Sequence, residues 1–328
     1  MTFKYKNVYV GATSTVTGPY EKKGLLGKYY DKCYDDLYFN ENTWEQAEVR
    51  SILDSIEILL KKINKKKSEI DLHLGGDLLN QIVATNYASS KLEIPFIGLY
   101  SACATSTSGI SLAASLIDNK KIKNAIVTSS SHNNGAEKQY RNPVEYGAPK
   151  KNYTTFTVTG CGSIYLTKDK SKIKVESSTI GSVVDMGITD VSNMGAVMAP
   201  AAAKTIYEHL KDTKRDINYY DLVLTGDLGM VGKSILKEYM KEEYKMSLNN
   251  YEDSACIIFD IKKQKVYQGG SGVACLPLVS YSYIIRKMLE GNYKKVLLVA
   301  TGALMNTTMC NQKLSIPAIA HAVSLEVV

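Results

Sequence analysis

The sequence predicts an α/β protein made of two duplicated βα halves. Short apolar segments typical of buried strands alternate along the chain with segments whose apolar residues recur at helical spacing. Residues 71–79 and 221–229 match at six of nine positions, which carry Asp, Leu, Leu, Gly, Asp and Leu. A cysteine turn at residues 98–109 has a counterpart at 269–275, and each leads into a helical pattern. The two expected halves, packed about a pseudo-twofold axis, are residues 1–172 and 173–328.

The first half is expected to begin with a strand over residues 8–12 and a loop over 14–36. The sequence Thr43–Gln46 matches a capping box and opens a helix. The apolar face of this helix comprises Val49, Ile52, Leu53, Ile56, Leu59, Leu60 and Ile63. Further strands are expected at 71–79, where the strand runs into a glycine turn, and at 125–128. The cysteine turn lies between these two strands.

The second half repeats this order of strands and helices. Its expected strands are residues 173–180, 220–225 and 294–302, and the first half ends with a further expected strand at 156–166. Helices are expected at 200–210 and 278–289, and Pro200 is placed as the opening residue of the first, because the first helical position needs no N–H.

Length and composition favour a folded globular protein. The chain has 328 residues, of which 45% are hydrophobic and 22% charged, so a sizeable core can form. The net charge of +7 is partly a local lysine run, and a solvated helix end explains that run better than a nucleic-acid patch. The positive balance still favours small acids or an anionic membrane surface as partners.

The six cysteines show no CxxC pair and no regular spacing. This pattern favours reduced thiols over a disulfide framework or a zinc site. The N-terminus has no signal-peptide pattern, and no window contains 18 uninterrupted apolar residues. We therefore expect a soluble protein without a transmembrane segment, which reaches a membrane only through partners or lipid charge.

Cys103 lies between a short apolar strand and a helical pattern, among residues with small side chains. A thiol at the first turn of a helix is near the positive end of the helix dipole, which favours the thiolate. The same turn offers N–H groups to an anion. The alternative is that Cys103 is only a small buried residue, as free cysteines often are. The turn alone leaves both interpretations open.

The stretch 129–147 leaves the end of a strand, where α/β proteins place ligands. His132, Asn133 and Arg141 are its candidate ligand-binding residues, and the arginine fork suits a carboxylate. The alternative is a solvated loop with ion pairs such as Glu137–Arg141. We favour a site role for His132 and a solvated position for Lys138.

Asp77 and Asp227 occupy equivalent places in the repeat, where they either line the interface of the halves or cap the turns that follow them. The other three histidines have different expected roles. His209 is expected on the surface, His73 in the core, and His321 in either a structural or a site position. Cys161 and Cys275 are expected to be packing residues.

Taken together, these features resemble the thiolase fold, and the Cys103 turn and residues 156–163 resemble ketoacyl-ACP synthase III. The resemblance is closer to the stage V sporulation protein AD family of endospore-forming bacteria. It runs almost end to end and rests on residues 76–81, 129–147, 184–190, 193–203, 225–229 and 315–323.

The resemblance implies a layered αβαβα structure that binds dipicolinic acid or its calcium chelate and uses no cofactor or metal. It also implies SpoVA membrane proteins as partners at the inner spore membrane, in dipicolinate uptake into the forespore and release at germination. Thiolase-like proteins are commonly dimers, so a homodimer is a further expectation.

Ketoacyl synthases add a second-half histidine and an asparagine to the cysteine. The matching positions here, Thr225–Leu228 and Gly269–Gly272, carry neither, so Cys103 is expected to be the vestige of a nucleophile in a protein that binds without turnover. The second hypothesis is an acyltransferase or condensing enzyme that uses Cys103 with His132 or His321 as base. The third is a scaffold with an empty cleft.

Overall fold

The computed structural model describes residues 1–140 and 150–328, and twelve of the strands that it describes form one long sheet with a repeated topology. Its order is β11-β10-β13-β14-β9-β2-β8-β6-β4-β5. The bounds of these strands are β2 Tyr9–Thr17, β4 His73–Gly76, β5 Phe96–Gly98, β6 Asn124–Ser131, β8 Gly160–Thr167, β9 Ile173–Ile180, β10 Leu222–Thr225, β11 Tyr251–Asp253, β13 Lys295–Ala303 and β14 Ala318–Val327. Four shorter strands are β1 Thr2–Lys4, β3 Lys32–Cys33, β7 Phe156–Thr157 and β12 Gly270–Ser271.

The sheet order is symmetric about its middle. Counted inward from the two ends, β5 corresponds to β11, β4 to β10, β6 to β13, β8 to β14 and β2 to β9. Neighbouring strands also have the same relative direction in the two halves. Strand β4 is parallel to β5 and β6, and β10 is parallel to β11 and β13. Strands β8 and β14 are each antiparallel to both of their neighbours. The predicted duplication is therefore present in the topology, while the boundary at 172/173 stays a prediction.

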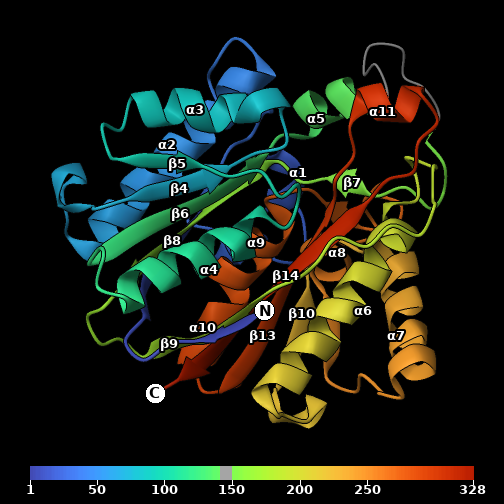
Figure 1. Cartoon of the computed structure of the whole chain (residues 1–328). Coiled ribbons are helices and arrows are strands. Elements are labelled where there is room, and N and C mark those ends of the chain that lie inside the picture. The colour runs from blue at the N-terminus through green and yellow to red at the C-terminus, as the bar shows by residue number, and fades with distance from the viewer. Residues whose placement is uncertain (141–149) are drawn as a thin grey trace.

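Helices cover the two parts of the sheet and fill the space between them (Figure 1). The outer helices are α2 Trp44–Ile63 and α3 Val83–Ser90 in the first half and α6 Met194–Thr213 and α7 Gly229–Tyr244 in the second. The inner ones are α4 Thr105–Asp118 and the continuous run of α9 Cys275–Val279, the π-helical η6 Ser280–Ile284 and α10 Ile285–Leu289. The shorter helices are α1 Pro19–Lys22, α5 Asn133–Tyr140, α8 Ser254–Ile258, α11 Thr307–Asn311 and the 3₁₀ turns Gly27–Tyr29, Lys67–Glu69, Asn80–Ile82 and Ile217–Tyr219.

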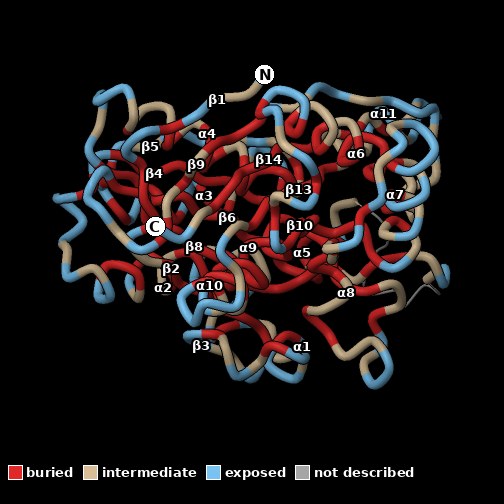
Figure 2. Tube along the Cα trace, turned by 90° about the horizontal axis from the view of Figure 1, so that it is seen from below, coloured by how far each residue is buried: buried red, intermediate tan, exposed pale blue. Residues whose placement is uncertain are grey.

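Helix α4 lies at the centre of the molecule, packed against β4 and β6 of the first half and against β13 and β14 of the second. Its apolar residues Ile110, Ala113 and Ile117 are almost completely buried. Figure 2 shows the same pattern for the whole chain, with the central strands buried and the connecting turns exposed. The layered thiolase-like αβαβα arrangement predicted from the sequence is confirmed, and α4 is its middle layer with the α9–α10 run.

Three predictions of local structure are wrong. The first strand continues to Thr17, because residues expected to form a loop pair with β8 as far as Gly160. The predicted strand 156–166 is two strands, β7 and β8, in different sheets. Pro200 does not open a helix: α6 begins at Met194, capped by the side chain of Asn193, and its close packing tolerates the proline inside it.

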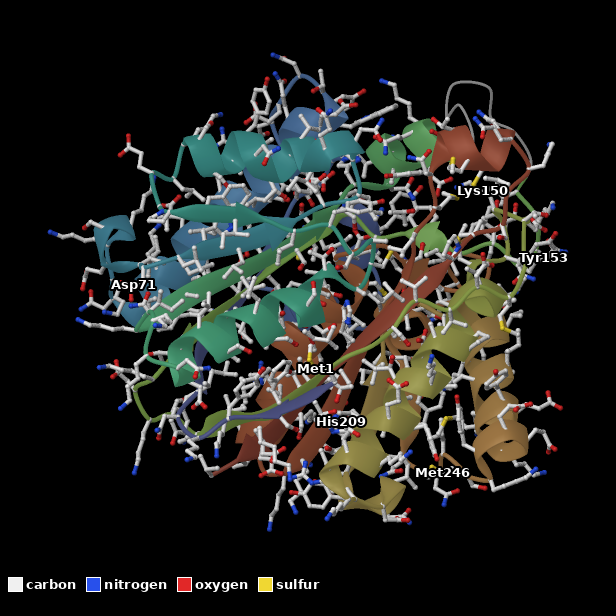
Figure 3. The ribbon with its side chains drawn as sticks, in the orientation of Figure 1. Met1, Asp71, Lys150, Tyr153, His209 and Met246 are labelled. Carbon is white, nitrogen blue, oxygen red and sulfur yellow. The ribbon has the colours of Figure 1, made fainter. Side chains whose placement is uncertain are left out.

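His209 is also misplaced by the sequence analysis, because it is fully buried on α6 (labelled in Figure 3). Its Nδ1 lies 2.7 Å from the hydroxyl of Thr179, and its Nε2 lies 2.6 Å from the hydroxyl of Tyr220. The polar residues around it in the sequence belong to the opposite face of the helix. A histidine with both ring nitrogens hydrogen-bonded is a stable part of a core.

The crossing of α6 and α7 depends on two glycines. A Cβ on Gly232 would lie 2.6 Å from the Cα of Gly195, closer than real Cβ contacts. We expect Gly232→Ala to lower the free energy of unfolding by about 1–3 kcal/mol, because α7 would have to move away from α6. The exposed Ser234→Ala on the same helix should change it by less than about 0.5 kcal/mol. Urea unfolding measures both, and equal stabilities would contradict the close crossing.

Candidate functional site

A cavity of about 60 Å³ lies where the two halves meet. A single water needs roughly 10–15 Å³ on the same scale, so the cavity holds more than one. The residues that line it come from both halves. They are Leu78, Tyr100, Cys103, Ala136, Tyr140 and Thr157 from the first, and Met194, Met198, Asp227, Ser271, Gly272, Ala303 and Met305 from the second.

Cys103 is half-buried, immediately before the N-cap residue of α4. The turn is held by the backbone N–H of Ala104, which donates to the carbonyl of Ser101 at 3.0 Å, and by the Thr105 hydroxyl, which donates to the carbonyl of Ala102 at 2.7 Å. Ala102 has a φ of +47°, a left-handed conformation that residues with a Cβ seldom adopt. The strain is typical of a turn that presents a side chain to a site.

The second half comes very close to this turn. A Cβ on Gly302, at the end of β13, would lie 2.5 Å from the carbonyl oxygen of Ser101 and 3.1 Å from the backbone nitrogen of Ala104. Only glycine permits this approach without movement of the backbone. The contact fixes Cys103 against the carboxyl end of β13, where Ala303 and Met305 line the cavity.

Asp227 joins the second-half turns to each other. Its Oδ1 accepts a hydrogen bond from the Thr301 hydroxyl at 2.7 Å, and its Oδ2 accepts one from the backbone N–H of Gly272 at 3.0 Å. Gly272 has a φ of +98°, which brings that N–H inward. Asp253 lies behind it, and burial together with the charge of Asp227 raises the pKa of Asp253 to about 6. The second-half wall therefore carries the carboxylate of Asp227, with that of Asp253 behind it.

Two tyrosines form the opposite wall, and their hydroxyl oxygens are 3.4 Å apart. The hydroxyl of Tyr140 also donates to the carbonyl of Leu78. Burial raises the pKa of both tyrosines above the usual value of a phenol, so both stay protonated at neutral pH and can donate hydrogen bonds. These tyrosines also border a wider groove of about 540 Å³, lined additionally by residues 79–82 and 304–306.

Of the predicted site residues, Cys103 and Asp227 line the cavity together. Asp77 occupies the place in the first half that Asp227 occupies in the second, but it does not line the cavity. Its carboxylate accepts hydrogen bonds from the backbone N–H of Thr85 at 2.8 Å and of Leu79 at 2.9 Å. Asp77 therefore braces its turn, which is the capping role that the sequence left open.

His132 is buried at the end of β6 and does not line the cavity. Its ring lies between Trp44 and Phe39, each with its ring centre 6.4 Å away, and its Nε2 is 2.8 Å from the carbonyl oxygen of Leu37. Burial lowers its pKa to about 4, so the imidazole is neutral at pH 7. Asn133 donates from its side chain to the carbonyl of Thr157 at 3.0 Å.

Arg141 lies outside the described residues, directly after Tyr140 in the sequence. Lys138 is exposed and 3.8 Å from a carboxylate oxygen of Glu45, which agrees with the expected solvated position. His321 is buried on β14, where its Nδ1 accepts from the N–H of Gly181 at 3.2 Å, and it does not line the cavity. His73, Cys161 and Cys275 are fully buried, as expected.

Sequence reasoning missed the two tyrosines and the methionines of α6 as lining residues. Tyr100 was counted only as part of an apolar strand, and Met194 and Met198 precede the helix that the sequence predicted. Ser271 lies in the glycine-rich turn that matches the asparagine turn of ketoacyl synthases. That match could have identified Ser271 as a lining residue from the sequence.

The architecture and the position of the cysteine define a protein of the thiolase-like class. Solved structures with this fold include 3-oxoacyl-[acyl-carrier-protein] synthase III from Aquifex aeolicus, with a TM-score of 0.60 and 14% identity, covering 97% of this chain and 99% of that one. Acetamide-bound OleA of Xanthomonas campestris has a TM-score of 0.61 and 12% identity, covering 98% and 99%. At these identities the likeness concerns the fold alone.

The family model for stage V sporulation protein AD matches residues 1–326. Stage V sporulation protein AD of Bacillus subtilis is 44% identical over 319 residues, which cover 97% of this chain and 94% of that protein. The chain therefore belongs to the stage V sporulation protein AD family, as the sequence motifs indicated.

No helix within residues 1–140 and 150–328 is long and apolar enough to cross a membrane.

The buried state of His132 predicts a measurable pH dependence of stability. The folded protein holds the neutral ring, with a pKa of about 4 against about 6.5 in the unfolded chain. The contribution of this neutral ring to the free energy of unfolding is complete above pH 6.5 and is lost as the pH falls toward 4. Over that range the free energy of unfolding falls by about 1.4 kcal/mol per pH unit.

We expect His132→Gln to make urea unfolding less dependent on pH between pH 7 and 5 by the share of one histidine, because His73, His209 and His321, whose pKa values burial also lowers, keep their shares. Asn133→Ala removes a buried side chain that does not titrate, so it should lower stability by a similar amount at each pH. A His132→Gln variant with the wild-type slope would contradict the assignment of a neutral, buried imidazole.

Proposed function

We propose that this protein binds dipicolinic acid in the cavity between its halves and does not catalyse condensation. Acting with SpoVA membrane proteins, it would serve dipicolinate uptake into the forespore and release at germination. The observation that carries the proposal is the set of residues around Cys103. Asp227 and Ser271 both line the cavity. They lie in the two turns that match the histidine turn and the asparagine turn of ketoacyl synthases, and here these turns carry neither histidine nor asparagine.

The chemistry of these residues favours binding over turnover. Condensation needs a thiolate and hydrogen-bond donors aimed at the oxyanion that develops on the acyl group. Asp227 accepts hydrogen bonds from Thr301 and Gly272, so its side chain offers no donor to an oxyanion. The described lining residues include no histidine and no asparagine, so they offer no imidazole to act as a general base.

The lining suits a flat aromatic ligand with polar ends. Tyr100 and Tyr140 offer ring faces, the hydroxyl of Tyr100 offers a donor, and the methionine side chains adapt to a planar ring. The N–H groups of Ala104 and Thr105 already donate within the turn, so one carboxylate would be received by other backbone N–H groups at the start of α4. Dipicolinate has two carboxylates, so the second one needs its own partner.

The described lining residues include no lysine, arginine or histidine to pair with the second carboxylate. Arg141 follows Tyr140 directly in the sequence, and Tyr140 lines the cavity, so Arg141 is the cation that we propose. This assignment rests on sequence position and on the need to pair a buried charge.

The purified protein should neither condense nor hydrolyse acyl thioesters over multiple turnovers. The measurement is release of free thiol from acetyl- and malonyl-thioesters, followed in parallel with the wild type and Cys103→Ala. Turnover that disappears in Cys103→Ala would contradict the proposal and favour the acyltransferase hypothesis. Equal background rates in both proteins are the expected result.

Arg141→Ala should weaken dipicolinate binding by more than a hundredfold, because loss of the partner of a buried charge costs about 3–5 kcal/mol. Isothermal titration measures this, with calcium removed by a chelator and again with calcium present. Lys138→Ala is the matched control, since its ammonium group is exposed near Glu45, and it should bind like the wild type.

Wild-type affinity in a folded Arg141→Ala variant would remove Arg141 from the site. Binding by that variant only in the presence of calcium would support the role of Arg141, because the chelated ligand would then bring the cation that the variant lacks. Absence of dipicolinate binding by the wild type under both conditions would contradict the proposed function and favour a scaffold with an empty cleft.

A further inference from the structure

One end of the first half carries a net positive charge as large as that of the whole chain. Four connections meet there: the α2–β4, α3–β5 and α4–β6 turns and the β8–β9 turn, comprising residues 61–71, 91–95, 118–124 and 167–174. They contain 13 lysines and five acidic residues, a net charge of +8 against +7 for the whole chain. The lysines are Lys61, Lys62, Lys65, Lys66, Lys67, Lys91, Lys120, Lys121, Lys123, Lys168, Lys170, Lys172 and Lys174. We call these four turns the basic end.

Strand register brings these turns together. Asn124 at the start of β6 is paired with Thr167 at the end of β8, and Tyr9 is paired with both Thr167 and Lys174. The backbone N–H of Lys168 also donates to the carbonyl of Lys123 at 3.1 Å. Figure 3 labels Asp71, within the basic end, at the left edge of the view, away from Lys150 and Tyr153 at the right.

The duplicated topology supplies an internal comparison. The corresponding connections of the second half are α6–β10, α7–β11, α10–β13 and the end of β14, residues 211–221, 245–250, 289–294 and 325–328. They contain five basic and five acidic side chains, so their net side-chain charge is zero. The fold does not require an excess of lysine at such turns, because the equivalent turns of the second half have no net side-chain charge.

The charge of the basic end is largely unneutralised. Among the described residues, only Lys61, Lys62 and Lys65 of the 13 lie within 4.0 Å of a carboxylate oxygen. Two of the acidic residues are engaged with the backbone instead. Asp71 accepts the N–H of Lys123 at 2.6 Å, and Asp118 accepts the N–H of Lys6 at 2.8 Å. Eleven of the lysines are exposed, and nine of these have no carboxylate within 4.0 Å among the described residues, so an anionic partner can reach their ammonium groups.

We infer that the basic end docks directly on the surface of an anionic lipid bilayer. An anionic leaflet attracts lysines near its surface by roughly the same amount per residue, without a specific contact for each. A broad group of lysines on several turns therefore suits a bilayer. This inference goes beyond the ligand proposed above and does not depend on it.

The residue types favour a bilayer over a nucleic acid. The basic end contains no arginine and no Phe, Trp or Tyr side chain within its four turns. Base recognition and single-strand binding use arginine forks and aromatic stacking, and duplex grooves are read by a helix or strand pair. The lysine ammonium group is a strongly hydrated point charge, and such a charge is sufficient for attraction to the diffuse negative potential of a lipid surface.

The inference also sets an orientation. The cavity lies at the carboxyl ends of the parallel strands, where the turns after β10 and β13 provide Asp227, Ala303 and Met305. The basic end lies at the opposite ends of β4 and β6. Docking through the basic end would therefore leave the cavity on the side of the protein away from the lipid.

The test is co-sedimentation of the full chain with vesicles of phosphatidylglycerol and phosphatidylcholine, compared with vesicles of phosphatidylcholine alone, without dipicolinate. The test variant is Lys121→Glu/Lys168→Glu/Lys170→Glu, and its matched control is Lys211→Glu/Lys262→Glu/Lys294→Glu. All six lysines are exposed, and both triple variants change the net charge by the same amount. Circular dichroism checks that both are folded.

The wild type is expected to bind only the anionic vesicles and to be released by 0.5 M NaCl. The test variant should lose binding by about a hundredfold or more, and the control should stay within about tenfold of the wild type. A Lys→Gln version of the test variant should fall between them. Equal loss in test and control variants, equal binding to neutral vesicles, or release from vesicles by equimolar duplex DNA would each overturn the inference.

Discussion

The structure depends on the burial of α4 between the two halves. Its apolar face contacts strands of both parts of the sheet, so neither half can cover it alone. Because α4 is the shared middle layer, its N-terminal turn must lie at the junction of the halves. The glycine at 302 then lets β13 approach the backbone of Ser101 and Ala104. The position of Cys103 is therefore a consequence of packing.

The same junction determines what the cavity can do. Once α4 is in place, the second-half turns after β10 and before α9 face Cys103, and their side chains decide the chemistry. Asp227 holds both turns together through Thr301 and Gly272. A hydrogen-bonded carboxylate therefore makes this side of the cavity rigid. The fold is thiolase-like, and the acidic side chain at this place in the lining is Asp227.

Much of the fold was predictable because it follows from periodicity and repetition. Strand β9 has the bounds that the sequence predicts, and the duplicated motif correctly pairs β4 with β10. Of the candidate site, the sequence identified Cys103 and Asp227, since both lie at strand ends in repeated turns. The direction in which the His132 side chain points was not predictable. Its ring packs against Trp44, which belongs to a segment distant in sequence. Tyr140 was missed for the same reason, since only tertiary structure brings α5 to the Cys103 turn.

Protection of cysteines from alkylation tests the central claim, that the cavity at the junction of the halves holds dipicolinate. Cys103 lines the cavity, whereas Cys33 is half-buried on β3 and does not line it. Peptide mass spectrometry of the protein treated with iodoacetamide measures the alkylation rate of each thiol separately. Saturating dipicolinate should slow alkylation of Cys103 at least tenfold and leave the rate at Cys33 unchanged. Binding of dipicolinate with no protection of Cys103 would contradict the account.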